Sequence, residues 1–169
     1  MIVGVLKEIT EHERRVALTP EITQKLIDEG VEVWVEPGAG MKSNFPDEQY
    51  TASGATIAGN RDDVLSESDI LLTIQTPAEE ELKKLKKGAV LICFLWALQH
   101  PDLVELLKEL EISALGMDAV PRISRAQNMD ALSSMSSIAG YKSALIAANE
   151  LDKYLPMMMT AAGTIPPAK

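Results

Sequence analysis

A run of thirteen residues, PRISRAQNMDALS at positions 121–133, has the side chains best suited to chemistry in this sequence of 169 residues. The guanidinium groups of Arg122 and Arg125 can fork onto phosphate or carboxylate oxygens. The amide of Gln127 both donates and accepts hydrogen bonds, which suits a ligand that carries a carboxamide. Together with Asp130 and Ser133, these side chains could hold a polar, anionic ligand.

The residues on either side of this run predict that it is a loop between two regular elements. Residues 112–117 form an apolar pattern typical of a strand, and residues 134–151 are rich in the small residues of a closely packed helix. Loops held between rigid elements often carry binding residues. The same residue types also occur in solvated loops, where Asp130 or Ser133 would cap the following helix. Composition alone leaves both interpretations open.

The rest of the chain alternates apolar runs with helical patterns. Strands are predicted at residues 2–6, 31–35, 55–58, 69–74, 89–95 and 112–117. Helices are predicted between them, at residues 20–30, 47–53, 62–66, 78–85 and 101–110. This alternation predicts an α/β, Rossmann-like layered fold with a mostly parallel sheet. In such sheets the ligand binds beyond the carboxyl ends of the strands.

Composition excludes several classes of protein. The hydrophobic content of 46% is enough for a core, and the net charge of −9 argues against a nucleic-acid partner and against direct docking on an anionic membrane. No stretch reaches about 18 apolar residues without charges, so no spanning helix is expected. The start of the chain lacks the pattern of a signal peptide. The expected compartment is the cytoplasm.

Several residues that could carry chemistry are assigned structural roles. Cys93 lies in an apolar run without basic neighbours, which predicts a buried, unreactive thiol. His12 and His100 are isolated from other ligand types, so no metal site is predicted and each is expected at the surface or at a helix cap. The glycines of residues 36–40 lack the G-x-G-x-x-G spacing, because position 43 is Ser43. They are expected to form a turn.

Three stretches together resemble the alanine dehydrogenase and nicotinamide nucleotide transhydrogenase family, over the whole chain. The first is GVLKE at 4–8 with ERRVALTP at 13–20, which is shared across the family. The second is the loop at 121–133, and the third is LPMMMTAAGT at 155–164. The second and third are similar to the transhydrogenase branch, whose α subunit binds NAD(H) in a proton-translocating complex.

Two departures from the family pattern favour that branch. Alanine dehydrogenases carry a catalytic histidine after the strong strand and a substrate-binding lysine after the preceding strand, where this chain has FLWA at 94–97 and IQTP at 74–77. Reduction of pyruvate needs a proton donor beside the carbonyl. Direct hydride transfer between two nicotinamides needs positioning instead. Arg15, a substrate residue in the dehydrogenase branch, is expected to be structural.

The resemblance implies roles for the loop residues and for partners. Arg122, Asp130 and Ser133 would hold the nicotinamide end of NAD(H), with Arg125 as a further cofactor-binding residue. Gln127 would reach toward a partner component that binds NADP(H), and Gln127 and Asp130 are the expected catalytic residues. The assembly would be a homodimer that is joined to membrane and NADP(H)-binding components. It would lie at the cytoplasmic face of a membrane that this chain does not span.

The resemblance also implies a domain organisation. Residues 1–133 would form an α/β domain that is incomplete without a returning C-terminal segment. Residues 134–169 would be a linking helix and a connector toward an absent dinucleotide-binding Rossmann domain, with the consecutive methionines 157–159 as packing material and Pro166–Pro167 excluding an inner strand. This chain alone is expected to be inactive.

Two alternatives stay open. The chain could be a fragment of an alanine- or saccharopine-type NAD-dependent dehydrogenase with a relocated proton donor. It could also be a non-catalytic assembly module that uses its small-residue helix as a dimer face.

Overall fold

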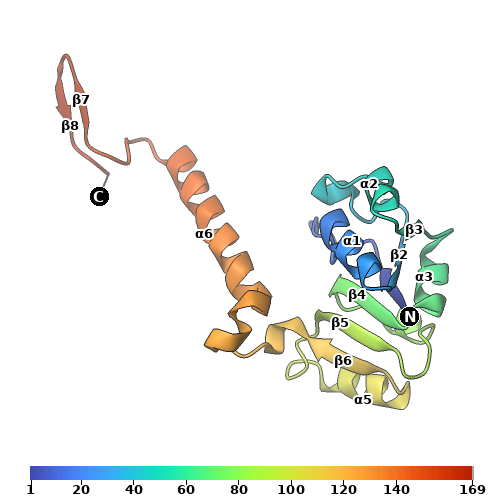
Figure 1. The fold of residues 1–169 in the computed structure, drawn as a ribbon. Coiled ribbons are helices and arrows are strands. Elements are labelled where there is room, and N and C mark those ends of the chain that lie inside the picture. Colours follow the sequence, from blue (N-terminus) through green and yellow to red (C-terminus); the bar gives the residue numbers. More distant parts are fainter. Residues whose placement is uncertain (169) are drawn as a thin grey trace. The chain divides into compact units, whose positions relative to one another are not determined.

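The computed structural model describes residues 1–168, which form two units (Figure 1). The sheet unit, Met1–Val120, contains a six-stranded sheet with helices on both faces. The helix–hairpin unit, from Pro121 onward, contains a long helix and a two-stranded hairpin.

All neighbouring strands of the six-stranded sheet are parallel, in the order β3-β2-β1-β4-β5-β6. The chain moves outward from β1 to β3 and then crosses to the other side of β1. The strand order therefore reverses between β1 and β4, which is where open α/β sheets bind ligands. This topology confirms the predicted Rossmann-like α/β fold. The strands are β1 (Ile2–Val5), β2 (Glu32–Val35), β3 (Thr56–Ile57), β4 (Ile70–Gln75), β5 (Val90–Phe94) and β6 (Ser113–Gly116).

Helices cover each face of the sheet with a separate apolar core. On one face, Leu71 and Leu91 pack in a cluster with Val64, Leu82 and Leu107. On the other face, valines of β1 and β2 pack with Leu18 and Tyr50. The first core lies under α3 (Arg61–Glu67), α4 (Glu79–Leu82) and α5 (Pro101–Glu109), and the second under α1 (Pro20–Asp28) and α2 (Asp47–Ala52). A short 3-10 turn, η1 (Met41–Ser43), precedes α2.

One contact between α3 and the sheet requires a glycine. A Cβ added at Gly4 would lie 1.9 Å from the Ser68 Oγ and 2.8 Å from a methyl carbon of Val64. Both distances are shorter than van der Waals contact, so only glycine lets α3 pack this closely on β1.

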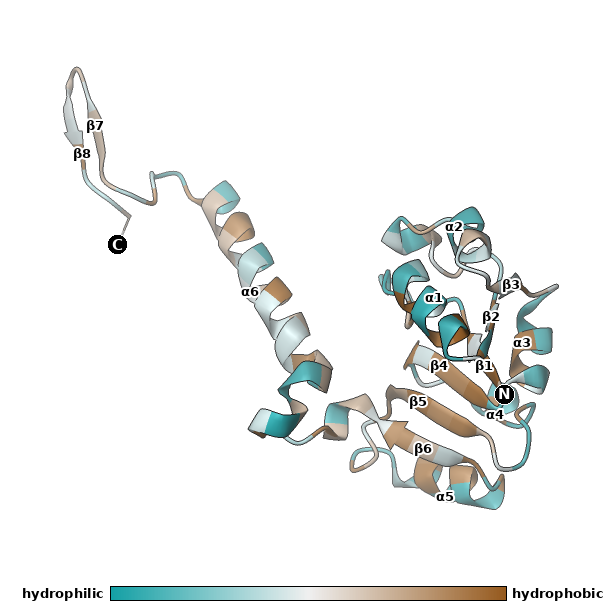
Figure 2. Cartoon of the chain, in the orientation of Figure 1, coloured by the Kyte–Doolittle hydropathy of each residue, from teal (hydrophilic) through white to brown (hydrophobic). Residues whose placement is uncertain are grey.

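The face that α1 and α2 cover is left open over β5 and β6. Ile92 pairs with Leu115, which is 59% exposed. Neither Val90 nor Ile92 belongs to the core under α1 and α2, although both point to that face. Figure 2 shows the apolar character of these two strands. Parallel sheets are usually covered by other elements on both faces. Within residues 1–120, this apolar surface of β5 and β6 lacks such a cover.

The helix–hairpin unit consists of a 3-10 turn η3 (Ser124–Met129), the helix α6 (Ala131–Glu150) and the antiparallel strands β7 (Met158–Thr160) and β8 (Gly163–Ile165). The helix starts three residues before the predicted position 134. The hairpin was not predicted, because its turn residues Ala161 and Ala162 are not typical of hairpins. The Thr160 hydroxyl supplies the turn's hydrogen bonds instead, as it accepts from the Ala162 N–H at 3.3 Å and donates to the Gly163 carbonyl at 3.1 Å.

Within residues 1–168, no helix combines the length and the hydropathy needed to cross a membrane.

Candidate functional site

The buried carboxylate of Glu8 fixes the loop after β1 to the end of β4. Its Oε1 accepts a hydrogen bond from the Ile74 N–H at 2.6 Å, and its Oε2 accepts one from the Gln75 N–H at 3.3 Å. The ladder between β4 and β5 shifts register at this point, which frees those N–H groups for a side chain. Glu8 is 6% exposed, and its burial raises the pKa of the carboxyl group. Glu8 therefore holds Gln75 at the carboxyl edge of the sheet.

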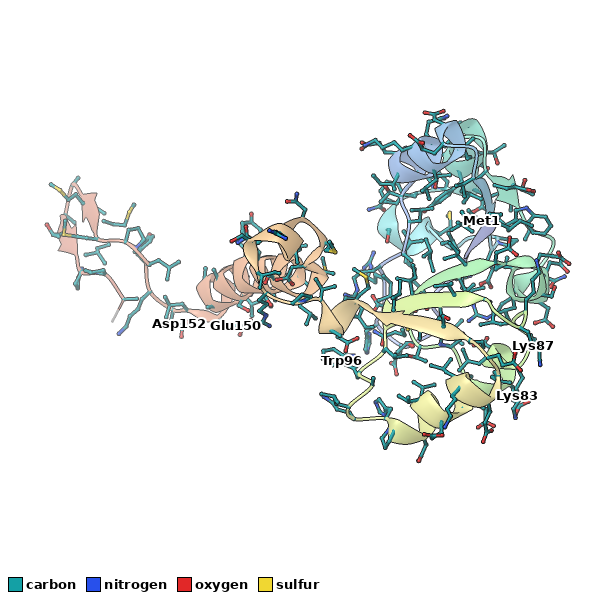
Figure 3. The ribbon with its side chains drawn as sticks, turned by 60° about the horizontal axis from the view of Figure 1, so that its bottom comes forward. Met1, Lys83, Lys87, Trp96, Glu150 and Asp152 are labelled. Atoms are coloured by element: carbon teal, nitrogen blue, oxygen red, sulfur yellow. The ribbon has the colours of Figure 1, made fainter. Side chains whose placement is uncertain are left out.

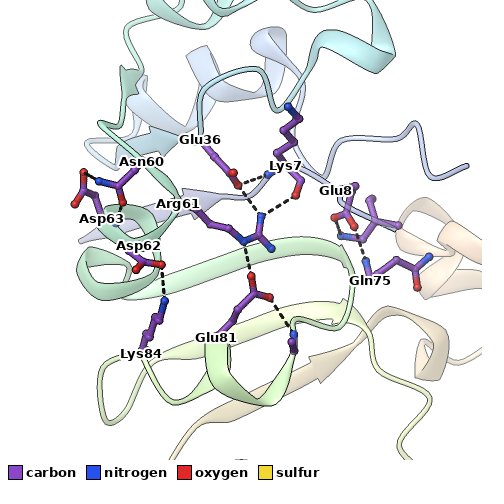
Figure 4. Close-up of polar contacts among 12 residues, drawn as sticks. Lys7, Glu8, Glu36, Asn60, Arg61, Asp62, Asp63, Gln75, Glu81 and Lys84 are labelled. Atoms are coloured by element: carbon purple, nitrogen blue, oxygen red, sulfur yellow. Dashed lines mark hydrogen bonds and ion pairs between the residues drawn. The ribbon is translucent and has the colours of Figure 1, made fainter. Parts of the chain in front are cut away.

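Arg61 joins the loops after β1 and β2 to α4 (Figure 4). Its Nη1 donates to the Lys7 carbonyl at 2.8 Å and to the Glu36 Oε2 at 2.7 Å, and its Nε donates to Glu81. The side chains of Arg61, Glu36 and Glu81 are only 21%, 12% and 16% exposed. Ion pairs this far from water are weakly screened. The network therefore fixes three segments that border the same edge.

A second ion pair lies between the ends of β4 and β5. The Arg15 Nε and Nη2 donate to the two carboxylate oxygens of Glu13 at 2.8 and 2.7 Å, and the Gln75 Nε2 donates to Glu13 at 2.9 Å. The hydrogen bonds from Arg15 lower the pKa of the Glu13 carboxyl to about 2. The guanidinium carbon of Arg15 lies 5.4 Å from the centre of the Phe94 ring, within the range of a cation–π contact. Arg15 is thus held by the protein's own groups.

An aromatic pair at the end of β5 borders a cavity of about 440 Å³. The rings of Phe94 and Trp96 stack with centres 6.4 Å apart and planes 21° from parallel. Trp96 is 39% exposed, and Figure 3 shows it beyond the end of β5, with Lys87 at the other end of that strand. Gln75, Gln99 and His100 also line the cavity. In the sequence, the position of Trp96 stood out only because the dehydrogenase pattern has a histidine there.

The predicted binding loop presents three unpaired side chains. Arg122, Arg125 and Gln127 are exposed, and their side chains make no hydrogen bond to any of residues 1–168. They lie in or just before η3, whose backbone turns tightly. Their guanidinium and amide groups are therefore available to an external ligand.

Asp130 and Ser133, the other predicted site residues, bond to each other. Asp130 is the N-cap of α6: its Oδ1 accepts from the Ser133 N–H at 2.9 Å, and its Oδ2 accepts from the Ser133 hydroxyl at 2.6 Å. These hydrogen bonds lower the pKa of Asp130. The structure therefore shows the capping role that composition allowed, while a role of the same carboxylate toward a cofactor remains a prediction.

The remaining reactive residue types lie in ordinary surroundings. Cys93 is buried, and burial raises the pKa of its thiol to about 11. His12 is exposed, and His100 occupies the N-cap position of α5 without a side-chain capping bond. In the described part of the chain, no cluster of three or more His, Cys, Asp and Glu side chains is arranged to hold a metal ion.

Comparison with known proteins agrees with this architecture. Residues 4–139 match the family described as "Alanine dehydrogenase/PNT, N-terminal domain". The NAD(P) transhydrogenase subunit alpha of Haemophilus influenzae is 43% identical over an alignment that covers all of this chain and 33% of the relative. The crystal structure of transhydrogenase from Sinorhizobium meliloti superposes with a TM-score of 0.92 at 39% identity, covering 99% of this chain and 50% of that one.

Alanine dehydrogenases are also similar, but less so. The alanine dehydrogenase of Bacillus subtilis is 37% identical over 90% of this chain and 39% of its own length. The chain thus spans less than half the length of the curated relatives that it matches. Since the family match covers most of residues 1–168 and the parallel sheet agrees with it, this chain belongs to the alanine dehydrogenase/PNT N-terminal domain family.

Proposed function

We propose that this chain is the N-terminal portion of the NAD(H)-binding component of a proton-translocating NAD(P) transhydrogenase. The observation that carries the proposal is the likeness to transhydrogenase α subunits over the whole chain, at higher identity than to alanine dehydrogenase. The complete component would pass a hydride between NAD(H) and NADP(H), and membrane partners would couple that transfer to proton translocation.

The unpaired donors of the loop support this proposal, because they fit the chemistry of a dinucleotide. Arg122 and Arg125 offer guanidinium groups to phosphate oxygens or to a carboxamide oxygen. Gln127 offers an amide that can pair with a carboxamide or reach a partner component that binds NADP(H). Asp130, already ionised and oriented by Ser133, would accept a hydrogen bond from the ligand.

The mechanism that follows is one of positioning. The nicotinamide supplies the hydride chemistry when it is bound, and the protein's task is to hold the ring in place. Within the sheet unit, Gln75 ends β4 and Trp96 follows β5, at the places where the dehydrogenase pattern has a lysine and a histidine. A reaction that moves a hydride without moving a proton needs neither of those groups.

Two exposed apolar surfaces support the proposed partners and domain organisation. The helix α6 has no buried residue, although Ile138, Tyr141 and Ile146 are large and apolar. Its small residues let a second copy of the helix approach closely, so we propose a homodimer that includes α6. The open face over β5 and β6 fits a returning segment of the complete protein, which would finish the domain predicted for residues 1–133. Joined to its membrane components, the assembly would lie at the cytoplasmic face.

The proposal is tested with the full-length natural protein and its partner components. NADH and NADP are supplied together, the products are separated, and the amount of reduced NADP is measured. We expect hydride transfer that depends on both components. The Arg122→Ala variant should bind NADH more weakly, whereas Lys142→Ala, on α6, should bind it as the native protein does. Absence of NADP reduction by the complete assembly would refute the proposal.

One observation favours a second candidate function. The imidazole of His100 lines the cavity at the end of β5 and makes no capping bond, so it is a candidate for a relocated proton donor. This arrangement would suit an alanine- or saccharopine-type dehydrogenase. Incubation of the full-length protein with pyruvate, ammonium and NADH tests it. Alanine formation that disappears in His100→Gln would favour the dehydrogenase over the transhydrogenase.

A further inference from the structure

We propose that Glu8 is a pH-sensitive latch at the carboxyl edge of the sheet. Its ionised carboxylate ties the loop after β1 to the end of β4, and protonation releases the Gln75 side of that tie while the Ile74 side stays closed. The latch lies wholly within the sheet unit and needs no ligand, so it does not depend on the proposed function.

The latch consists of one side chain that bridges two segments 66 residues apart. The Glu8 Oε1 accepts from the Ile74 N–H at 2.6 Å, whereas the Oε2 accepts from the Gln75 N–H at the longer distance of 3.3 Å (Figure 4). The ladder from β4 to β5 shifts register between Leu72 and Gln75, which leaves both N–H groups to the carboxylate. The two hydrogen bonds are therefore unequal, and the longer, weaker one holds Gln75.

Protonation changes what the two carboxylate oxygens can do. An ionised carboxylate accepts at both oxygens, whereas a neutral carboxyl keeps one carbonyl oxygen and gains a hydroxyl that donates. The shorter bond keeps the carbonyl oxygen on the Ile74 N–H, so the hydroxyl lies beside the Gln75 N–H. That hydroxyl can donate elsewhere, because Glu8 lines a cavity of about 230 Å³. The Gln75 N–H thereby loses its charged acceptor.

The surroundings of Glu8 favour its neutral form. Burial raises the pKa of the Glu8 carboxyl, and so does the charge of Glu13, while the bonds from the Ile74 and Gln75 N–H groups and the charge of Arg61 lower it by less. The other charged or titratable side chains around Glu8 are those of Lys7, Arg15, Glu36, Lys42, Glu81 and Cys93. The latch therefore opens above the pH at which an ordinary glutamate, with a pKa of about 4.5, would titrate.

Release of Gln75 affects the neighbouring ion pair. The Gln75 Nε2 donates to Glu13 at 2.9 Å, and the same carboxylate accepts both hydrogen bonds from Arg15. The Glu13 carboxyl has a pKa of about 2, so it stays ionised over the range in which Glu8 takes up its proton. A change at the Glu13–Arg15 pair in that range would report the proton on Glu8.

Amide hydrogen exchange, followed by NMR between pH 4 and pH 7, tests the latch in the native chain. Each measured rate is compared with the intrinsic rate at the same pH, which gives a protection factor for each amide. As the pH falls, the protection of the Gln75 amide should drop by about tenfold or more, as expected for loss of a hydrogen bond to a charged acceptor. The protection of the Ile74 amide should change little, so it controls for general loosening of the fold.

Two variants separate the latch from other titrations. Glu8→Gln keeps an acceptor for the Ile74 N–H and places its own amide N–H beside Gln75, so the Gln75 amide should have low protection at every pH. Glu48→Gln, on the exposed first turn of α2, should titrate as the native protein does. The NMR signal of the Arg15 Nε–H should shift with the same midpoint as the Gln75 amide in the native protein, and should not shift in Glu8→Gln.

The outcomes decide each part of the proposal. A drop in protection at Gln75 alone, with a midpoint above 4.5 and absent from Glu8→Gln, would support it. Constant protection of Gln75 from pH 7 to pH 4 in the native chain would overturn it, and this test holds even if Glu8→Gln fails to fold. Equal losses at Ile74 and Gln75 would overturn the one-sided release, and an Arg15 signal that ignores the midpoint would overturn the link to the ion pair.

Discussion

Removing the guanidinium of Arg61 should destabilise the sheet unit more than any change to a surface ion pair. In Arg61→Met, the carboxylates of Glu36 and Glu81 keep their charge at 12% and 16% exposure but lose their partner. Breaking a fully buried ion pair costs about 3–5 kcal/mol, because one charge stays unpaired. The residual exposure of these groups places the expected cost near the lower end, about 3 kcal/mol.

Urea denaturation followed by circular dichroism measures this cost as a change in the free energy of unfolding. A matched variant identifies its cause: Arg61→Met combined with Glu36→Gln and Glu81→Gln removes the unpaired charges and should recover most of the stability. Lys25→Met breaks the exposed pair with Glu21 and should cost less than about 0.5 kcal/mol. An Arg61→Met protein as stable as Lys25→Met would refute the account of the network.

Three further predictions concern single residues of the sheet unit. Arg15 lowers the pKa of the Glu13 carboxyl to about 2, so the stability that Glu13 contributes is present above its ordinary pKa of about 4.5 and is lost as the pH falls toward 2. In urea unfolding between pH 6 and pH 2, the Glu13→Gln protein should therefore lose less stability than the native protein. Cys93, with a thiol pKa of about 11, should resist a thiol reagent at pH 8 in the folded protein and react fully in urea; rapid reaction of the native protein would contradict its burial. Gly4→Ala places a methyl group 1.9 Å from the Ser68 Oγ and should lower the free energy of unfolding by about 2 kcal/mol, measured by urea denaturation.

The sheet could be predicted from sequence because its strands are continuous apolar runs. In the run from Val90 to Phe94, the residues that face α5 are buried, and those on the other face are half-buried or buried. Such runs, separated by helical patterns, leave few arrangements other than a parallel sheet. The start of α1 at Pro20 was predicted for the same local reason, since proline favours the first helical position.

The polar networks could not be predicted, because their members are distant in sequence. Arg61 pairs with Glu36, 25 residues before it, and with Glu81, 20 residues after it. The backbone N–H of Leu95, just after β5, donates to the carboxylate of Asp118, which lies in a 3-10 turn, η2 (Met117–Ala119). Only the fold brings these groups together, and no local pattern distinguishes them from solvated charges.

The binding loop is an intermediate case. Its residue types indicated that it could hold a polar, anionic ligand. In the structure, three of its side chains make no hydrogen bond to residues 1–168. Its capping aspartate is also explained by local structure, because an N-cap Asp followed by Ser133 is a common way to start a helix. Capping and cofactor binding use the same carboxylate, so the structure of this chain alone fits both.

Hydride transfer in the full-length assembly tests the central claim most directly. The Asp130→Asn variant keeps the helix cap, because asparagine also caps helices, but it removes the charge. The Gln127→Ala variant removes the amide, and Asn128→Ala, on the same exposed turn, is the control. The account predicts that Asp130→Asn and Gln127→Ala slow NADP reduction by NADH at least about tenfold, equivalent to about 1.4 kcal/mol of barrier, while Asn128→Ala does not. Native rates in both variants, with the assembly intact, would contradict it.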